Sequence, residues 1–267
     1  MHLGVNVPNY GPGTDPGVLR EWARLVEGLG FDLLMVSDHV VVTPDVAVRY
    51  PEPFFEPFTT LSWLAGITTR VRLGTTVIVL PYRHPLLVAR MAKNLDELSG
   101  GRLVLGVGAG GARQEFEALG VPFTERGRLT DQCLTALRQE WGAESSIPIW
   151  VGGNSDAAIR RSVKFGAAWH PLRFTMPFLR DAVTRHSPPA LAPRIALRLT
   201  GAPVGDQERL VGTGSLEQVI DDLAELRRLG AETVVLDPYH GDPEETRRPD
   251  IAWRALTAVA THWRTAS

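Results

Sequence analysis

The chain has 267 residues, enough for one large domain or two small ones, and a (β/α)8 barrel of roughly 250 residues would use nearly all of them. The 44% hydrophobic content allows a sizeable core, and a formal charge of −2 argues against binding to nucleic acid or an anionic membrane. Because Cys133 is the only cysteine, the chain has no internal disulfide and no cysteine zinc site. With no signal-peptide pattern and no apolar run near ~20 residues, we expect a cytoplasmic protein.

Short β-rich runs alternate with longer helical patterns along the chain. The first helical pattern begins at Asp15 and Pro16, which can supply an N-cap and a proline at the first helical position. Another runs from Pro85 to Leu98, and a third, from Leu216 to Leu229, follows a capping box. The runs predicted to be strands are Leu3–Val7, Leu33–Ser37, Val71–Val79, Leu103–Val107, Ile149–Gly152, Ala167–Trp169, Ile195–Leu199 and Thr233–Leu236.

This alternation of strands and helices predicts the fold class. Most of the predicted strands are apolar without a strict period of two, as expected for parallel strands that are buried on both faces. Eight β-then-α units favour closure into a single (β/α)8 TIM barrel over an open sheet, so we expect one domain over residues 1–267. The glycine-rich run Gly106–Gly111 lies at the fourth strand instead of the first, which gives no support to a Rossmann fold.

The active sites of such barrels lie at the carboxyl ends of the strands, and two segments there have specific chemical uses. His39 directly follows the second strand, where an imidazole can give or take a proton near neutral pH. A structural role for this histidine remains open. The residues Gly152–Ser155 let backbone approach a ligand closely and open a helix whose free N–H groups suit a phosphate. The alternative at that position is a plain helix N-cap by Asn154 or Ser155.

Four motifs, in a fixed order, point to a known family. They are Val36–His39, Arg72–Val77, Leu98–Gly108 and Trp150–Asn154. Together they resemble the bacterial luciferase-like superfamily, particularly its coenzyme F420-dependent oxidoreductase branch, over about residues 1–236. The resemblance implies a luciferase-like barrel that binds a flavin-type cofactor at its mouth. It also implies a homodimer, as family members commonly are.

The resemblance assigns candidate site residues. His39 is the candidate catalytic group that handles a proton close to the cofactor ring. A bulge in the third strand would carry a non-proline cis peptide between Thr76 and Val77. The candidate cofactor-binding residues are Asp38, Thr76, Val77, Gly108, Ala109, Gly110, Gly153, Asn154 and Ser155. Some sugar-phosphate dehydrogenases of the branch have an acidic glutamate where this chain has Gly111, so we do not transfer their substrate.

These residues support several hypotheses about function. The leading hypothesis is hydride transfer between F420 and a small organic substrate. The alternatives are an FMN-dependent monooxygenase that uses O2 and a reductase partner, and a barrel that holds flavin without catalysis. A metal-dependent hydrolase would use ligands from the set Asp38, His39, His84 and His170. Aromatic residues near the mouth indicate an apolar substrate or simple loop packing; they are Tyr10, Phe54, Phe55 and Trp169.

Overall fold

Parallel strands form the wall of a barrel in the computed structural model, which describes residues 1–142, 145–205 and 208–266. Their order is β7-β6-β5-β3-β2-β1-β11-β8. The ends of this path are joined by backbone hydrogen bonds from Ala192 to Trp169 (2.9 Å) and from Arg194 to Pro171 (2.8 Å). The strand bounds are β1 His2–Asn6, β2 Leu33–Val36, β3 Arg72–Thr75, β5 Leu103–Gly108, β6 Ile149–Gly152, β7 Ala168–His170, β8 Arg194–Ala196 and β11 Thr233–Asp237. The predicted TIM-barrel fold is confirmed.

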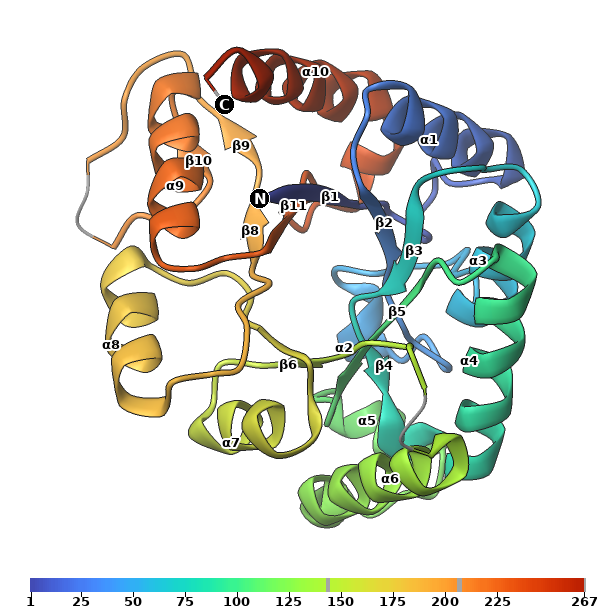
Figure 1. Ribbon diagram of the computed structural model, residues 1–267. Helices are drawn as coiled ribbons and strands as arrows, with labels where there is room; N and C mark the ends of the chain where they lie inside the picture. Colours follow the sequence, from blue (N-terminus) through green and yellow to red (C-terminus); the bar gives the residue numbers. More distant parts are fainter. Residues whose placement is uncertain (143–144, 206–207, 267) are drawn as a thin grey trace.

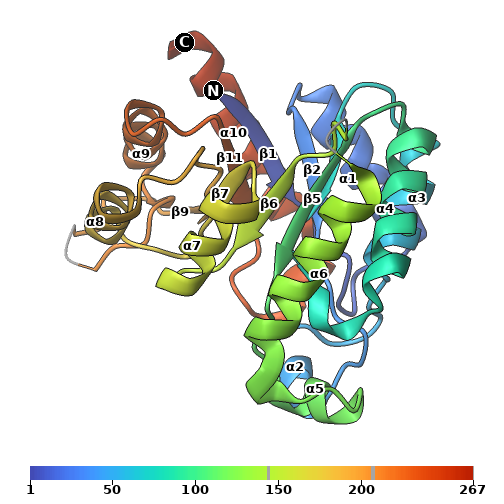
Figure 2. The same cartoon turned by 60° about the horizontal axis from the view of Figure 1, so that its bottom comes forward.

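A ring of helices surrounds these strands (Figure 1). The ring consists of α1 Pro16–Gly28, α3 Pro57–Ala65, α4 Pro85–Ser99, α6 Arg126–Trp141, α7 Asp156–Phe165, α8 Met176–His186, α9 Leu216–Arg228 and α10 Pro249–Ala266. Two short helices, α2 (Pro44–Ala47) and α5 (Arg113–Ala118), lie side by side at the end toward which the strands point (Figure 2). In the described part of the chain, no helix is long and apolar enough to cross a membrane.

Local sequence explains why these elements begin where they do. The Asp15 carboxylate accepts a hydrogen bond from Val18 N (2.8 Å) and caps α1, and the predicted capping box of Ser215 and Gln218 opens α9. Every residue of β2 is buried, because barrel side chains cover one face of the strand and helices cover the other. This burial on both faces accounts for the missing period-two pattern.

Two predicted strands are interrupted. The run Val71–Val79 divides into β3 and β4 (Ile78–Val79), and the Thr76–Val77 peptide between them is cis, as predicted. The expected strand Ile195–Leu199 was wrong as one element, because the chain leaves the barrel after β8. Its second half, β9 (Arg198–Leu199), instead pairs with β10 (Thr213–Gly214). The close approach of Gly212 to the carbonyl of Ala196 leaves no room for a Cβ at residue 212.

Candidate functional site

A cavity of about 790 Å³ opens at the carboxyl ends of the strands. It is lined by every predicted site residue except Asn154, namely Asp38, His39, Thr76, Val77, Gly108, Ala109, Gly110, Gly153 and Ser155. These residues come from the carboxyl ends of β2, β3, β5 and β6 and from the segments that follow, which the parallel arrangement brings to one end of the barrel. The volume lies within the range of about 300–1,000 Å³ typical of cofactor and ligand sites.

Glu115 on α5 positions His39. The fully buried carboxylate lies 2.7 Å from His39 Nδ1 and accepts hydrogen bonds from the Tyr82 hydroxyl and the backbone N–H groups of Val40 and Val41. Burial raises the pKa of Glu115, but the hydrogen bond and charge of His39 and the two backbone donors outweigh burial and leave that pKa lowered. Because an ionised carboxylate only accepts, Nδ1 carries the proton. Nε2 of His39 makes no hydrogen bond to a described residue, so it is the ring nitrogen that can interact with a ligand in the cavity.

The Asp38 carboxylate makes its hydrogen bonds away from the adjacent His39. It receives a two-pronged ion pair from Arg83 (both 2.7 Å) and a hydrogen bond from Val79 N (2.8 Å). Burial raises the pKa of Asp38, and the interaction with Arg83 opposes this rise. Since Val79 follows the cis peptide, Asp38 ties the end of β2 to the bulge, and it shapes the cavity wall.

The side chain of Val77 explains several of the cavity glycines. A Cβ on Gly108 would lie 2.7 Å from one Val77 methyl, and a Cβ on Gly152 would lie 2.8 Å from the other. Gly110 has a φ of +75°, and a Cβ there would lie 2.5 Å from a methyl of Val79. These glycines therefore let the bulge approach β5 and β6, and the result is a cavity wall made of backbone and small side chains.

A buried polar network holds the other side of the bulge. Arg194 donates to the carbonyl of Thr76 (3.0 Å) and to its hydroxyl (3.2 Å), and pairs with Asp237 (2.7 Å). The Thr76 hydroxyl lies 2.9 Å from His170 Nε2, while His170 Nδ1 contacts the carbonyl of Ala192. The carbonyl can only accept, so Nδ1 carries the proton and Nε2 accepts from Thr76. Because of this network, the Thr76 hydroxyl makes its hydrogen bonds to His170 and Arg194.

The same histidine makes stability depend on pH. Burial lowers the pKa of His170 to about 4 from the ordinary 6.5, helped by the charge of Arg194 and opposed by the hydrogen bond to Ala192. Between these values the unfolded chain binds a proton that the folded chain excludes, so stability falls as pH decreases. We expect the free energy of unfolding to be about 2 kcal/mol lower at pH 5 than at pH 7 from this group. Urea titration of the wild type and His170→Gln measures it, and an equal pH slope in both proteins would contradict the assignment.

The end of the cavity at the start of α7 can receive an anion. Ser155 caps α7 by accepting from Ala158 N (3.3 Å), so the cap interpretation of this residue is confirmed. Asn154 holds the backbone of Leu172 through bonds of 2.7 and 3.0 Å and does not line the cavity. Two arginines line this end as well: Arg126 on α6 and Arg161 on α7. Arg161 already pairs with Asp131 (2.6 Å), whereas Arg126 has no carboxylate partner among the described residues. The start of α7 and the Arg126 guanidinium together suit a phosphate or carboxylate.

The other candidate residues have structural roles. Tyr10 and Trp169 are fully buried and do not line this cavity. The four residues considered as metal ligands do not gather: Asp38 pairs with Arg83, and His84 accepts from Leu86 N as the cap of α4. No group of three His, Cys, Asp or Glu side chains able to hold a metal occurs in residues 1–142, 145–205 and 208–266.

Sequence reasoning missed Glu115, Arg126 and Arg161. The pattern typical of some relatives has an acid at the position of Gly111, and Glu115 lies four residues further along the chain. A signal was present, because Glu115 lies on the same helix as buried Phe116, and a carboxylate on the buried face of a helix requires partners. The two arginines carried no such signal, since arginines on helices are ordinarily exposed.

The sequence model of a family described as luciferase-like monooxygenase matches residues 1–192. The chain belongs to this luciferase-like family. Among curated proteins, the uncharacterized protein Rv0940c of Mycobacterium tuberculosis is 31% identical over 181 residues, which cover 55% of this chain and 63% of that protein. The putative coenzyme F420-dependent oxidoreductase Rv3520c of the same organism is 33% identical over 134 residues, covering 48% and 38%. The matches thus span less than two thirds of these relatives.

Solved structures with the luciferase-like fold match nearly the whole chain. The F420-dependent tetrahydromethanopterin reductase of Methanopyrus kandleri has a TM-score of 0.71 at 15% identity, covering 98% of this chain and 99% of that chain. A type II Baeyer-Villiger monooxygenase from Pseudomonas putida, in complex with FMN, has a TM-score of 0.73 at 14% identity, covering 97% and 96%. At these identities the likeness supports the fold alone.

Proposed function

We propose that this luciferase-like protein is an F420-dependent oxidoreductase that transfers a hydride between the deazaflavin and a small organic substrate. The observation that carries the proposal is the cavity at the barrel mouth, which contains both His39, paired with Glu115, and an anion-binding end. Such a cavity could hold both parts of the deazaflavin cofactor, its flat ring and its long anionic tail. The relative named as F420-dependent adds support through similarity.

The residues present fit such a group. Gly108, Gly110 and Gly153 offer backbone without side chains, and Val77 supplies an apolar surface between them. Arg126 and the start of α7 would hold the anionic tail, and Arg161, which pairs with Asp131, lies beside them on the cavity wall. When bound, the deazaflavin supplies the hydride chemistry. His39 would give or take one proton at Nε2, and Glu115 would keep that nitrogen available by holding the proton on Nδ1.

The second candidate is an FMN-dependent monooxygenase, which the FMN-bound structural neighbour favours. The anion-binding end alone does not separate the two cofactors, since both carry phosphate. An FMN enzyme of this type depends on a flavin reductase partner, whereas the proposed activity needs none.

Titration of the apoprotein with F420 and with FMN, followed by fluorescence, tests the choice. We expect F420 to bind more tightly, and a tenfold preference would correspond to ~1.4 kcal/mol. Arg126→Glu should weaken both cofactors at least about tenfold, because it places a negative charge at the anion-binding end. The matched control is Arg90→Glu, at an exposed position on α4 that lines no part of this cavity. Tighter FMN binding with reductase-dependent turnover would favour the second candidate.

A further inference from the structure

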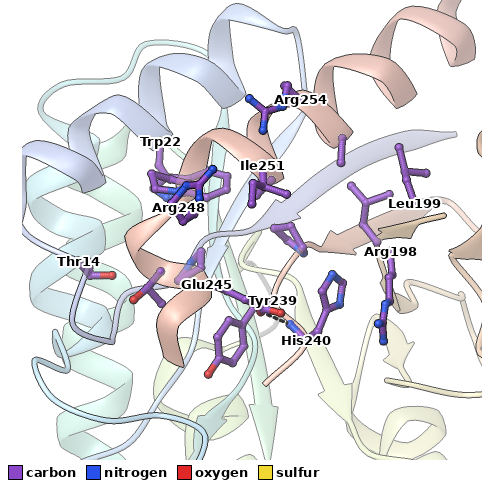
Figure 3. A pocket seen from close by; sticks show the side chains of 17 residues that line it. Thr14, Trp22, Arg198, Leu199, Tyr239, His240, Glu245, Arg248, Ile251 and Arg254 are labelled. Atoms are coloured by element: carbon purple, nitrogen blue, oxygen red, sulfur yellow. Dashed lines mark hydrogen bonds between the residues drawn. The ribbon is translucent and has the colours of Figure 1, made fainter. Parts of the chain in front are cut away.

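A second cavity, of about 490 Å³, lies beside the barrel mouth (Figure 3). It is bounded by segments that follow β8 and β11 and by α10, and its described lining shares no residue with the first cavity. Two tyrosine rings separate the cavities. Tyr239 lines the second cavity and Tyr50 the first, with ring centroids 6.0 Å apart. The second cavity is therefore a separate compartment, large enough for an organic molecule.

The walls of this cavity are apolar. Trp22 of α1 and Leu197 after β8 are buried against it, while Ile251 on α10 is 54% exposed although it is a large aliphatic side chain. In Figure 3, Ile251 and Leu199 lie on elements at opposite sides of the pocket. An apolar surface left open within a cavity favours a ligand with an apolar body.

The charged groups at this cavity are mostly cationic. Three arginines line it, Arg198, Arg248 and Arg254, against one carboxylate, Glu245. Glu245 accepts from the backbone N–H of His240 (2.7 Å), the contact drawn in Figure 3. Asp250 pairs with Arg248 (3.3 Å) and with Arg254 (3.0 Å). The guanidinium of Arg198 has no hydrogen bond or ion pair to any described residue, so one positive charge remains without a partner.

The position is also one that barrels use for anions. Loops after the last two strands of a (β/α)8 barrel frequently bind the phosphate group of a ligand. Here those loops carry Arg198 after β8 and His240 after β11. We propose that the second cavity is a binding site for an amphipathic organic anion, whose apolar body packs against Ile251 and Trp22 and whose acidic group pairs with Arg198. The site is distinct from the proposed cofactor site and does not depend on which cofactor is used.

The test uses 8-anilinonaphthalene-1-sulfonate, an aromatic sulfonate that fluoresces when bound, titrated into the purified protein with and without saturating FMN. With FMN filling the first cavity, we expect one saturable site for the probe to remain. Arg198→Glu and Ile251→Asp should each weaken binding at least about tenfold, because the first repels the sulfonate and the second adds a charge to the apolar wall. Both positions are exposed, so the variants should fold, which thermal unfolding checks.

The matched controls are Arg90→Glu on α4 and Val163→Asp on α7, where Val163 is 52% exposed and lines neither cavity. Both should bind the probe within about twofold of wild type. Unchanged binding in the Arg198 and Ile251 variants would overturn the proposal, as would the loss of all probe binding at saturating FMN.

Discussion

Replacement of His39 by alanine is expected to lower turnover about 100- to 10,000-fold while cofactor affinity stays within a few-fold of wild type, because a positioned acid or base contributes that range. The imidazole lines the cavity, Glu115 holds its Nδ1, and Nε2 has no partner among the described residues. Affinity should instead depend on the anion-binding end and the Val77 surface. Steady-state turnover and a fluorescence titration on one preparation measure both quantities.

Thermal unfolding on the same samples separates this chemistry from packing. The His39 ring lies 5.4 Å from those of Tyr50 and Phe54, so a purely structural histidine would lose these contacts on substitution. In that case the variant would unfold at lower temperature while activity per folded molecule stayed within a few-fold of wild type. Such a result would remove His39 from the mechanism.

Glu115→Gln is expected to change the proton position on His39 and to reduce turnover, since a wrong imidazole tautomer can cost up to ~10,000-fold. The carboxylate accepts four hydrogen bonds, with Oε1 facing Val40 N and Val41 N and Oε2 facing His39 and Tyr82. A carboxamide has one acceptor oxygen, which the two backbone donors would take. Its NH2 group would then face Nδ1 and favour the tautomer with the proton on Nε2. Nitrogen-15 NMR of the histidine ring reads the tautomer directly.

The matched control is Tyr82→Phe, which removes another donor to the same Glu115 oxygen. It should leave the tautomer of His39 and most of the turnover unchanged. The double variant His39→Ala with Glu115→Gln should be no slower than His39→Ala alone, because Glu115 acts through the imidazole. Additive losses in the double variant, or an unchanged NMR signature in Glu115→Gln, would assign Glu115 to local stability only.

Several parts of the site were predictable because they are local in sequence. The segment Gly152–Ser155 opens a helix, and His39 follows a strand, so the rule for barrels places both at the same end. The role of Asp38 was not predictable, because its partner Arg83 comes 45 residues later in the chain. The sequence does not show whether the Asp38 carboxylate faces Arg83 or the adjacent His39. The glycines of residues 106–111 were interpreted as a loop that contacts a ligand. The tertiary structure gives a further reason for glycine at position 108, because a Cβ there would collide with a methyl group of Val77.

Apolar runs and helix caps, which are local patterns, predicted the barrel and the order of its strands along the chain. The cis bulge was implied only by the family resemblance that the ordered motifs carry. Tertiary structure alone decided which side chains meet. Glu115 reaches His39 across 76 positions, and Arg198 lines a cavity with residues of α10. Such contacts depend on the closure of the barrel, which brings the ends of distant strands within hydrogen-bonding distance, and no periodicity along the chain encodes that distance.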